Sequence, residues 1–234
     1  RQPVSPAWWG LKMFVSALSP FLAMAGVLSV ILAIITGSLW AILPGASGTL
    51  IYLSYLYRVH GSINAPTGFM KAYGPKWETR ITSTQLANFL SNVFTLRLPR
   101  GSEFNLMHDI PFCTIPGTRR QLLCDLWQPA ENVTSSGLAF IYFHGSAWCV
   151  LDKDFGTRTF FRHLVSQGHV IMDVAYRLFP ETDMTGMVND VYRAIAWMKT
   201  NSSVYGVNPR NIVIGGGSAG AHLSLLAAYN KTPR

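Results

Sequence analysis

The strongest chemical signal in the sequence is a serine inside a cluster of glycines. Gly216-Gly217-Ser218-Ala219-Gly220 follows a β-branched run, Ile212 to Ile214, and precedes apolar residues at helical spacing. Strand, sharp turn and helix are the context that a G-x-S-x-G nucleophile elbow requires, because small neighbours let strand and helix approach closely. The pattern predicts that the Ser218 hydroxyl is a nucleophile at the end of a sheet. A Walker-type phosphate loop is disfavoured, since no lysine follows the glycines.

The elements that position this serine alternate between strand-like and helix-like patterns over residues 111–234. A hairpin is predicted at 112–115 and 121–127, with strands at 137–143, 169–175 and 211–214 and helices at 157–167, 187–198 and after Ser218. Such alternation indicates an α/β fold in which a mainly parallel sheet is covered by helices on both faces.

Three motifs over residues 111–234 occur in the order found in one family. His144-Gly-Ser-Ala-Trp148 resembles the His-Gly-Gly-Gly/Ala-Trp motif of hormone-sensitive-lipase-like esterases, and Tyr176-Arg-Leu-Phe-Pro-Glu181 resembles their Tyr-Arg-Leu-Ala-Pro-Glu. The segment Gly216–Gly220 completes the set. The resemblance implies an α/β-hydrolase fold. Kynurenine formamidases and membrane-bound prenylcysteine methylesterases are similar too, and the motifs do not separate these branches.

The resemblance also implies roles for the residues around Ser218. The backbone N–H groups of Gly145, Ser146 and Ala219 would hold the oxyanion of a tetrahedral intermediate, a contact worth about 10²–10³-fold in rate per donor. Ser146 departs from the family, which usually has glycine there. The residues expected to support the motifs without carrying out chemistry are His144, Trp148, Gly216 and Gly220.

A hydrolase triad cannot be completed in the usual order from the residues after Ser218. In α/β-hydrolases the nucleophile precedes an acidic residue and then a histidine, whereas only sixteen residues follow Ser218 and none is acidic. We therefore expect a fragment whose later strands, acid and histidine lie beyond residue 234, and which is inactive alone. His222 is expected to pack or to hydrogen-bond, and Arg177 and Glu181 to form a structural network, because buried charges need partners.

A long apolar segment precedes the hydrolase-like region. From Met13 to Tyr57, 45 consecutive residues contain no Asp, Glu, Lys or Arg, more than the roughly 20 that span a bilayer as a helix. The best single span is Pro20 to Leu43. A second pass through Leu50 to Tyr57 requires a turn at Thr36-Gly37-Ser38 and a proline, Pro44, inside a helix.

The chain is thus divided into three regions. Residues 1–57 are a predicted transmembrane region, 58–110 a linker whose segment Thr84 to Leu96 fits an amphipathic cap helix, and 111–234 the N-terminal part of the hydrolase domain. The lysines and arginines after residue 57 outnumber those before residue 13, which places the domain of a single-span protein on the cytoplasmic side.

The net charge of +8 favours a membrane surface over nucleic acid as the partner. Residues 1–110 hold eight Lys/Arg against three Asp/Glu, so the excess lies beside the apolar segment. No basic stripe with interleaved aromatic residues is present, and nucleic-acid binding is not expected. The three cysteines lack metal-ligand spacing, so neither a metal nor an organic cofactor is expected.

The leading functional hypothesis is a membrane-anchored serine hydrolase that cleaves a lipophilic or small carboxylic ester through an acyl-serine intermediate. Two alternatives stay open: an arylformamidase-type amide hydrolase, and a catalytically inactive protein that uses the hydrolase fold for binding or scaffolding. The sequence carries no signal for the oligomeric state.

Overall fold

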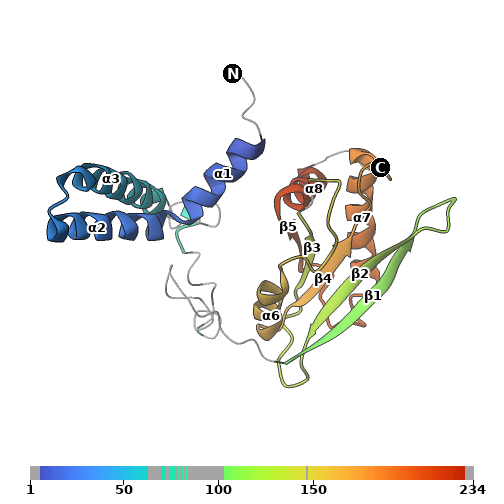
Figure 1. Ribbon diagram of the computed structural model, residues 1–234. Helices are drawn as coiled ribbons and strands as arrows, with labels where there is room; N and C mark the ends of the chain where they lie inside the picture. Colours follow the sequence, from blue (N-terminus) through green and yellow to red (C-terminus); the bar gives the residue numbers. More distant parts are fainter. Residues whose placement is uncertain are drawn as a thin grey trace. The chain divides into compact units, whose positions relative to one another are not determined.

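The computed structural model forms two units, Arg1–Ala87 and Asn88–Arg234, which we describe separately (Figure 1). The residues that the structure describes are 6–62, 70–71, 74–76, 79, 81, 83, 103–145 and 147–229. The amphipathic helix predicted at Thr84–Leu96 lies outside them.

The first unit is helical. It contains α1 (Pro6–Ala17), α2 (Ser19–Thr36) and α3 (Leu39–Ser62), and α2 and α3 lie side by side as a hairpin (Figure 1). Helix α2 ends at Gly37, whose φ of 69° is the left-handed conformation that glycine adopts without strain.

This turn corrects one prediction about the apolar segment. A continuous helix from Pro20 to Leu43 is wrong, because the left-handed Gly37 ends α2 and a new helix begins at Leu39. Helix α3 then continues through Pro44 to Ser62. The alternative with a turn at residues 36–38 is the one observed.

The two helices approach closely at a pair of glycines. A Cβ atom on Gly26 would lie 2.9 Å from the carbonyl oxygen of Gly45, and one on Gly45 would lie 3.0 Å from Val30 Cγ2. Small residues at such a crossing are typical of helices that pack in a membrane. By length and composition both helices can span a bilayer, and only 17% and 6% of their apolar windows are buried.

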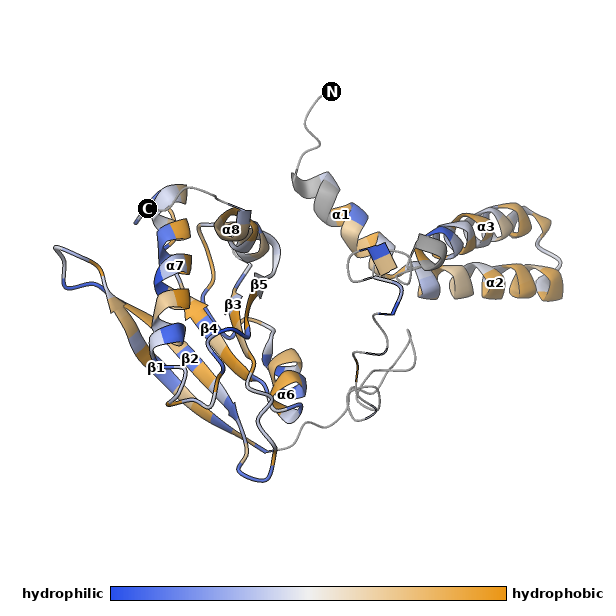
Figure 2. Cartoon of the chain, turned by 180° about the vertical axis from the view of Figure 1, so that it is seen from behind, coloured by the Kyte–Doolittle hydropathy of each residue, from blue (hydrophilic) through white to orange (hydrophobic). Residues whose placement is uncertain are grey.

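Helices α2 and α3 consist largely of apolar residues (Figure 2). The large exposed hydrophobic residues on α2 and α3 include Phe21, Leu28, Leu32, Ile35, Trp40, Leu43, Leu50 and Ile51. An apolar surface of this extent marks a site of contact with a membrane or a protein.

The second unit is a five-stranded sheet with three helices. The strands are β1 (Phe104–Thr114), β2 (Gln121–Pro129), β3 (Ala139–Phe143), β4 (Val170–Ala175) and β5 (Ile212–Gly216), and the helices are α6 (Arg158–Ser166), α7 (Met184–Thr200) and α8 (Ser218–Tyr229). Every element predicted after residue 111 is present. Strand β1, however, begins at Phe104, inside the segment 58–110 predicted as a linker.

The strand order is β1-β2-β4-β3-β5. Strand β2 is antiparallel to both β1 and β4, whereas β3 is parallel to β4 and β5. Four strands therefore run in one direction and β2 in the other. The sheet is mixed, with its parallel part at β4, β3 and β5, where the chain crosses over through helices.

Helices cover both faces of this sheet. Helices α7 and α8 pack on one face, where Met187, Val191 and Leu223 join the buried residues of the central strands. Helix α6 packs on the other face through Phe161 and Val165, against Trp127 and Ile171. Helices on both faces are the α/β-hydrolase arrangement expected from the sequence. The sheet is mixed rather than mainly parallel, because β2 pairs antiparallel with both β1 and β4.

The glycine contact in the hairpin can be tested by adding volume. Gly26→Leu should force α2 and α3 apart and destabilise the hairpin by roughly 1–3 kcal/mol, as overpacking usually does. Gly48→Leu is the matched control, because a Cβ atom on Gly48 meets nothing within 4 Å. Unfolding in detergent micelles, followed by circular dichroism, measures both; equal losses of stability would contradict the packing described.

Candidate active site

Ser218 lies at the turn between β5 and α8. Its backbone φ is 43°, in a region that few residues other than glycine adopt, and the residue is exposed. Strained backbone of this kind costs on the order of 1–3 kcal/mol and clusters at functional sites. The strand, turn and helix predicted around Ser218 are all present.

The glycines around Ser218 are required by contact with β3. A Cβ atom on Gly216 or Gly220 would overlap the carbonyl oxygen of Phe143, the last residue of β3. The N–H of Gly217 donates to the same oxygen over 3.3 Å. The turn is thus pressed against the end of the neighbouring strand, where no side chain fits.

Two residues predicted to bind an oxyanion lie beside the serine. A Cβ atom on Gly145 would lie 3.1 Å from the carbonyl oxygen of Gly217 and 3.4 Å from Ser218 Cβ. Ala219 is buried in the first turn of α8, where backbone N–H groups have no partner within the helix. Ser146, the third predicted donor, lies outside the described residues.

His144 is the first residue after β3, and its side chain is buried. Its ring stacks on Tyr176 at 4.7 Å between centroids, and the Tyr176 hydroxyl donates to the His144 carbonyl oxygen over 3.0 Å. Burial lowers the pKa of His144, which favours the neutral ring. The buried, stacked ring is the arrangement of an anchoring residue.

Trp148 belongs to the loop after β3 and contacts α8. Its indole meets the His222 imidazole edge to face at 5.6 Å, and its carbonyl oxygen accepts a hydrogen bond of 2.8 Å from the Phe179 N–H. Trp148 and its neighbour Ala147 both have positive φ, 64° and 46°. The loop is therefore held in an unusual conformation by contacts on two sides.

The segment after β4 pairs its charges differently from the network expected. Arg177 Nε and Nη2 bind the buried Asp190 of α7 at 2.9 and 2.8 Å. Glu181 instead pairs with Arg120 at 2.9 Å on the surface. Arg177 and Glu181 each have a structural partner, but they belong to two separate ion pairs.

A buried group of charges lies next to the loop after β3 and was not predicted from the sequence. Asp125 on β2 and Asp173 on β4 are 1% and 0% exposed and stand opposite each other in the sheet. Lys153, in the loop after β3, binds Asp125 at 2.8 Å. The available signal was an acidic residue in the middle of each of two apolar strands, which is rarely buried without a partner.

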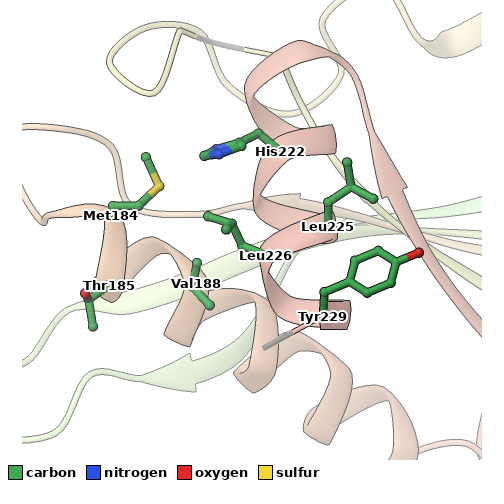
Figure 3. A pocket seen from close by; sticks show the side chains of 7 residues that line it. All are labelled: Met184, Thr185, Val188, His222, Leu225, Leu226 and Tyr229. Atoms are coloured by element: carbon green, nitrogen blue, oxygen red, sulfur yellow. The ribbon is translucent and has the colours of Figure 1, made fainter. Parts of the chain in front are cut away.

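An apolar pocket of about 480 Å³ lies between the start of α7 and the outer side of α8 (Figure 3). His222 borders it and lies four residues after Ser218, so the two residues share one face of the helix. Among the described residues, no histidine is hydrogen-bonded to Ser218. The pocket is lined by Met184, Thr185, Val188, His222, Leu225, Leu226 and Tyr229.

The contact between α8 and β3 gives a matched pair of variants. Gly220→Ala should lower the melting temperature, because its methyl group overlaps the Phe143 carbonyl, and the cost should be roughly 1–3 kcal/mol. Gly217→Ala should cost less, since its methyl group first meets the flexible Tyr142 side chain, 3.2 Å from the hydroxyl oxygen. Thermal unfolding compares them. A Gly220→Ala protein as stable as the wild type would disprove the close contact.

Comparison with known proteins shows that this unit is similar in sequence to ester hydrolases. The BD-FAE family model matches residues 124–234. The probable carboxylic ester hydrolase LipM of Mycobacterium tuberculosis is 36% identical over 105 residues, which are 44% of this chain and 24% of LipM. An AB hydrolase superfamily protein of Schizosaccharomyces pombe is 32% identical over 156 residues, 63% of this chain and 45% of that protein.

This chain therefore spans less than half of the length of these two curated relatives. The crystal structure of esterase B from Lactobacillus rhamnosis aligns with a TM-score of 0.46 and 24% identity, covering 70% of this chain and 48% of that one. Three observations point to the same fold: the matches in sequence, the mixed sheet, and the serine at the turn between β5 and α8. The unit that follows the apolar hairpin has the α/β-hydrolase fold and is related to the carboxylic ester hydrolases.

Proposed function

We propose that this chain carries the nucleophile of a membrane-anchored serine hydrolase that cleaves carboxylic esters. The observation that carries the proposal is the strained, exposed Ser218 with Gly145 packed against it. A strained serine at a tight turn has little structural justification unless its hydroxyl is used. The similarity to LipM, which is named a probable carboxylic ester hydrolase, supports the same reaction.

In the proposed reaction, Ser218 Oγ attacks the ester carbonyl and its proton passes to a histidine base. The N–H groups of Gly145, Ser146 and Ala219 donate to the oxyanion. The alcohol leaves with a proton, and water then hydrolyses the acyl-serine. The reaction also needs a histidine base and a carboxylate that orients it, and among the described residues no histidine is hydrogen-bonded to Ser218.

The apolar pocket supports an ester with an apolar part. It borders His222, one helical turn from the nucleophile, and its lining is mainly hydrocarbon from Leu225, Leu226 and Val188. Burying an acyl chain there would contribute about 0.8 kcal/mol for each methylene group removed from water.

The catalytic part of the proposal is tested in the full-length protein. Ser218→Ala should abolish labelling by a fluorophosphonate and lower ester hydrolysis by at least about 10⁴-fold. Ser224→Ala, a buried serine on the same helix whose hydroxyl donates to the Gly220 carbonyl, should retain both. Octanoate esters should be cleaved with a higher kcat/KM than acetate esters. A folded wild type that neither labels nor hydrolyses esters would leave a binding protein as the function.

The membrane part of the proposal comes from the exposed apolar surface of the hairpin. A core helix would be mostly buried, whereas the windows of α2 and α3 are 17% and 6% buried. A secretory signal has one apolar stretch of about 7–15 residues, and this chain has two longer ones joined by a turn. Lipid is the solvent that suits such a hairpin.

The hairpin also favours one orientation. Lys12 precedes α2, and Arg58, Lys71 and Lys76 lie at or after the end of α3, whereas the turn at residues 36–38 carries no charge. In a two-span hairpin both ends lie on one side of the membrane, so all of these positive charges fall on that side. The positive-inside rule then makes it the cytoplasmic side, and the hydrolase unit cytoplasmic.

The exposed Cys149 tests this orientation. In cells that express the full-length protein, a membrane-impermeant maleimide should label Cys149 only after the plasma membrane is permeabilised. Cys149→Ser is the control that identifies the labelled thiol, since Cys124 is buried but Cys113 is partly exposed. Modification of Asn132 or Asn201, which lie in N-glycosylation sequons, would show a lumenal domain and refute the assignment.

A further inference from the structure

Two carboxylates are buried side by side in the sheet. Asp125 on β2 and Asp173 on β4 are register partners, and both are almost completely inaccessible to solvent. Removing a charge from water costs several kcal/mol unless partners compensate. We therefore consider which groups bind each of the two carboxylates.

Asp125 is bound by three groups. Lys153 Nζ lies 2.8 Å from Oδ1, the Asp109 N–H donates to Oδ1 over 2.9 Å, and His108 Nδ1 lies 2.9 Å from Oδ2. Lys153 Nζ also lies 2.9 Å from the Asp109 carboxylate, and its side chain is only 13% exposed. The lysine thus reaches from the loop after β3 down to both β1 and β2.

Asp173 binds the next residue of the same loop. Its Oδ2 accepts a hydrogen bond of 2.6 Å from the Asp154 N–H, and its Oδ1 has no hydrogen-bond partner among the described residues. Burial raises the pKa of Asp173 to about 7. Asp125 therefore holds the side chain of Lys153, and Asp173 holds the backbone N–H of Asp154, the next residue of the loop.

The loop that they hold is the one that reaches Ser218. It begins with Gly145 against the serine and contains positive φ angles at Ala147, Trp148, Leu151 and Asp154. Four such angles outside glycine persist only where the surroundings impose them. Contacts from Tyr176 and Phe179 restrain the start of the loop, and the buried acids restrain its end.

We propose that Lys153 is a positioning residue, whose ion pairs with Asp125 and Asp109 hold the loop so that the Gly145 N–H is aimed at the oxyanion formed on Ser218. The hydrogen bond from the Asp154 N–H to Asp173 holds the next residue of the same loop. The inference rests on the proposed function, because it assigns a role in the same reaction. It adds a residue that contacts neither substrate nor nucleophile.

The test compares three variants of the full-length protein. Lys153→Met keeps the length of the side chain and removes the charge, and it should lower kcat for ester hydrolysis by about 10²-fold, the effect of losing one oxyanion donor, while KM changes less than about threefold. Lys153→Arg should restore most of kcat. Lys199→Met, an exposed lysine near the end of α7, is the control and should leave both constants unchanged.

Amide hydrogen exchange gives a readout that does not need activity. Exchange across residues 145–157 should be faster in Lys153→Met than in the wild type or Lys199→Met. If Lys153→Met does not fold, Asp125→Asn replaces it, with a smaller expected fall in kcat. Unchanged kcat and unchanged exchange would overturn the inference, as would parallel changes in kcat and KM that Arg does not rescue.

Failure of the proposed function has a different signature. A folded wild type without ester hydrolysis or Ser218 labelling would overturn the proposed function, and the positioning role in catalysis with it. Faster exchange in Lys153→Met would then show that the lysine holds the loop for another purpose.

Discussion

The close contact between the Phe143 carbonyl and the glycines that flank Ser218 determines the geometry of the site. Because Gly216 and Gly220 have no side chains, the start of α8 can touch the end of β3, and the serine must adopt a positive φ to make the turn. The same contact brings the loop after β3 to the serine, since Gly145 follows Phe143 by two residues. Ser218 and Gly145 are thus brought together by one packing constraint.

Buried charge complements this packing. An irregular loop cannot maintain several left-handed residues through its own hydrogen bonds, so its conformation depends on groups elsewhere in the fold. Here those groups are the carboxylates of Asp125 and Asp173, which the central strands hold rigidly. Their burial is costly, and Lys153 and the Asp154 N–H offset part of that cost. Such an arrangement favours a single loop conformation.

The two units of the chain follow different rules of packing. The sheet buries its apolar residues under helices on both faces, as a water-soluble α/β fold must. The hairpin does the reverse, with small residues such as Gly26 and Gly45 between its helices and large apolar residues on its outside. Small residues between helices and hydrocarbon outside are the pattern expected in lipid, where close packing rather than apolar burial holds helices together.

The sequence by itself determined the elements of the hydrolase unit and the position of Ser218 at the turn between β5 and α8, because alternating patterns and the glycines around Ser218 are local signals. Its hydropathy could not decide between one long apolar helix and two, whereas the structure has two, separated at the left-handed Gly37. Nor could it show that β1 begins at Phe104, since that strand is defined by pairing with β2. Only the tertiary structure brought Lys153 to Asp125, because the partners of a buried charge are distant in sequence and are chosen by the fold.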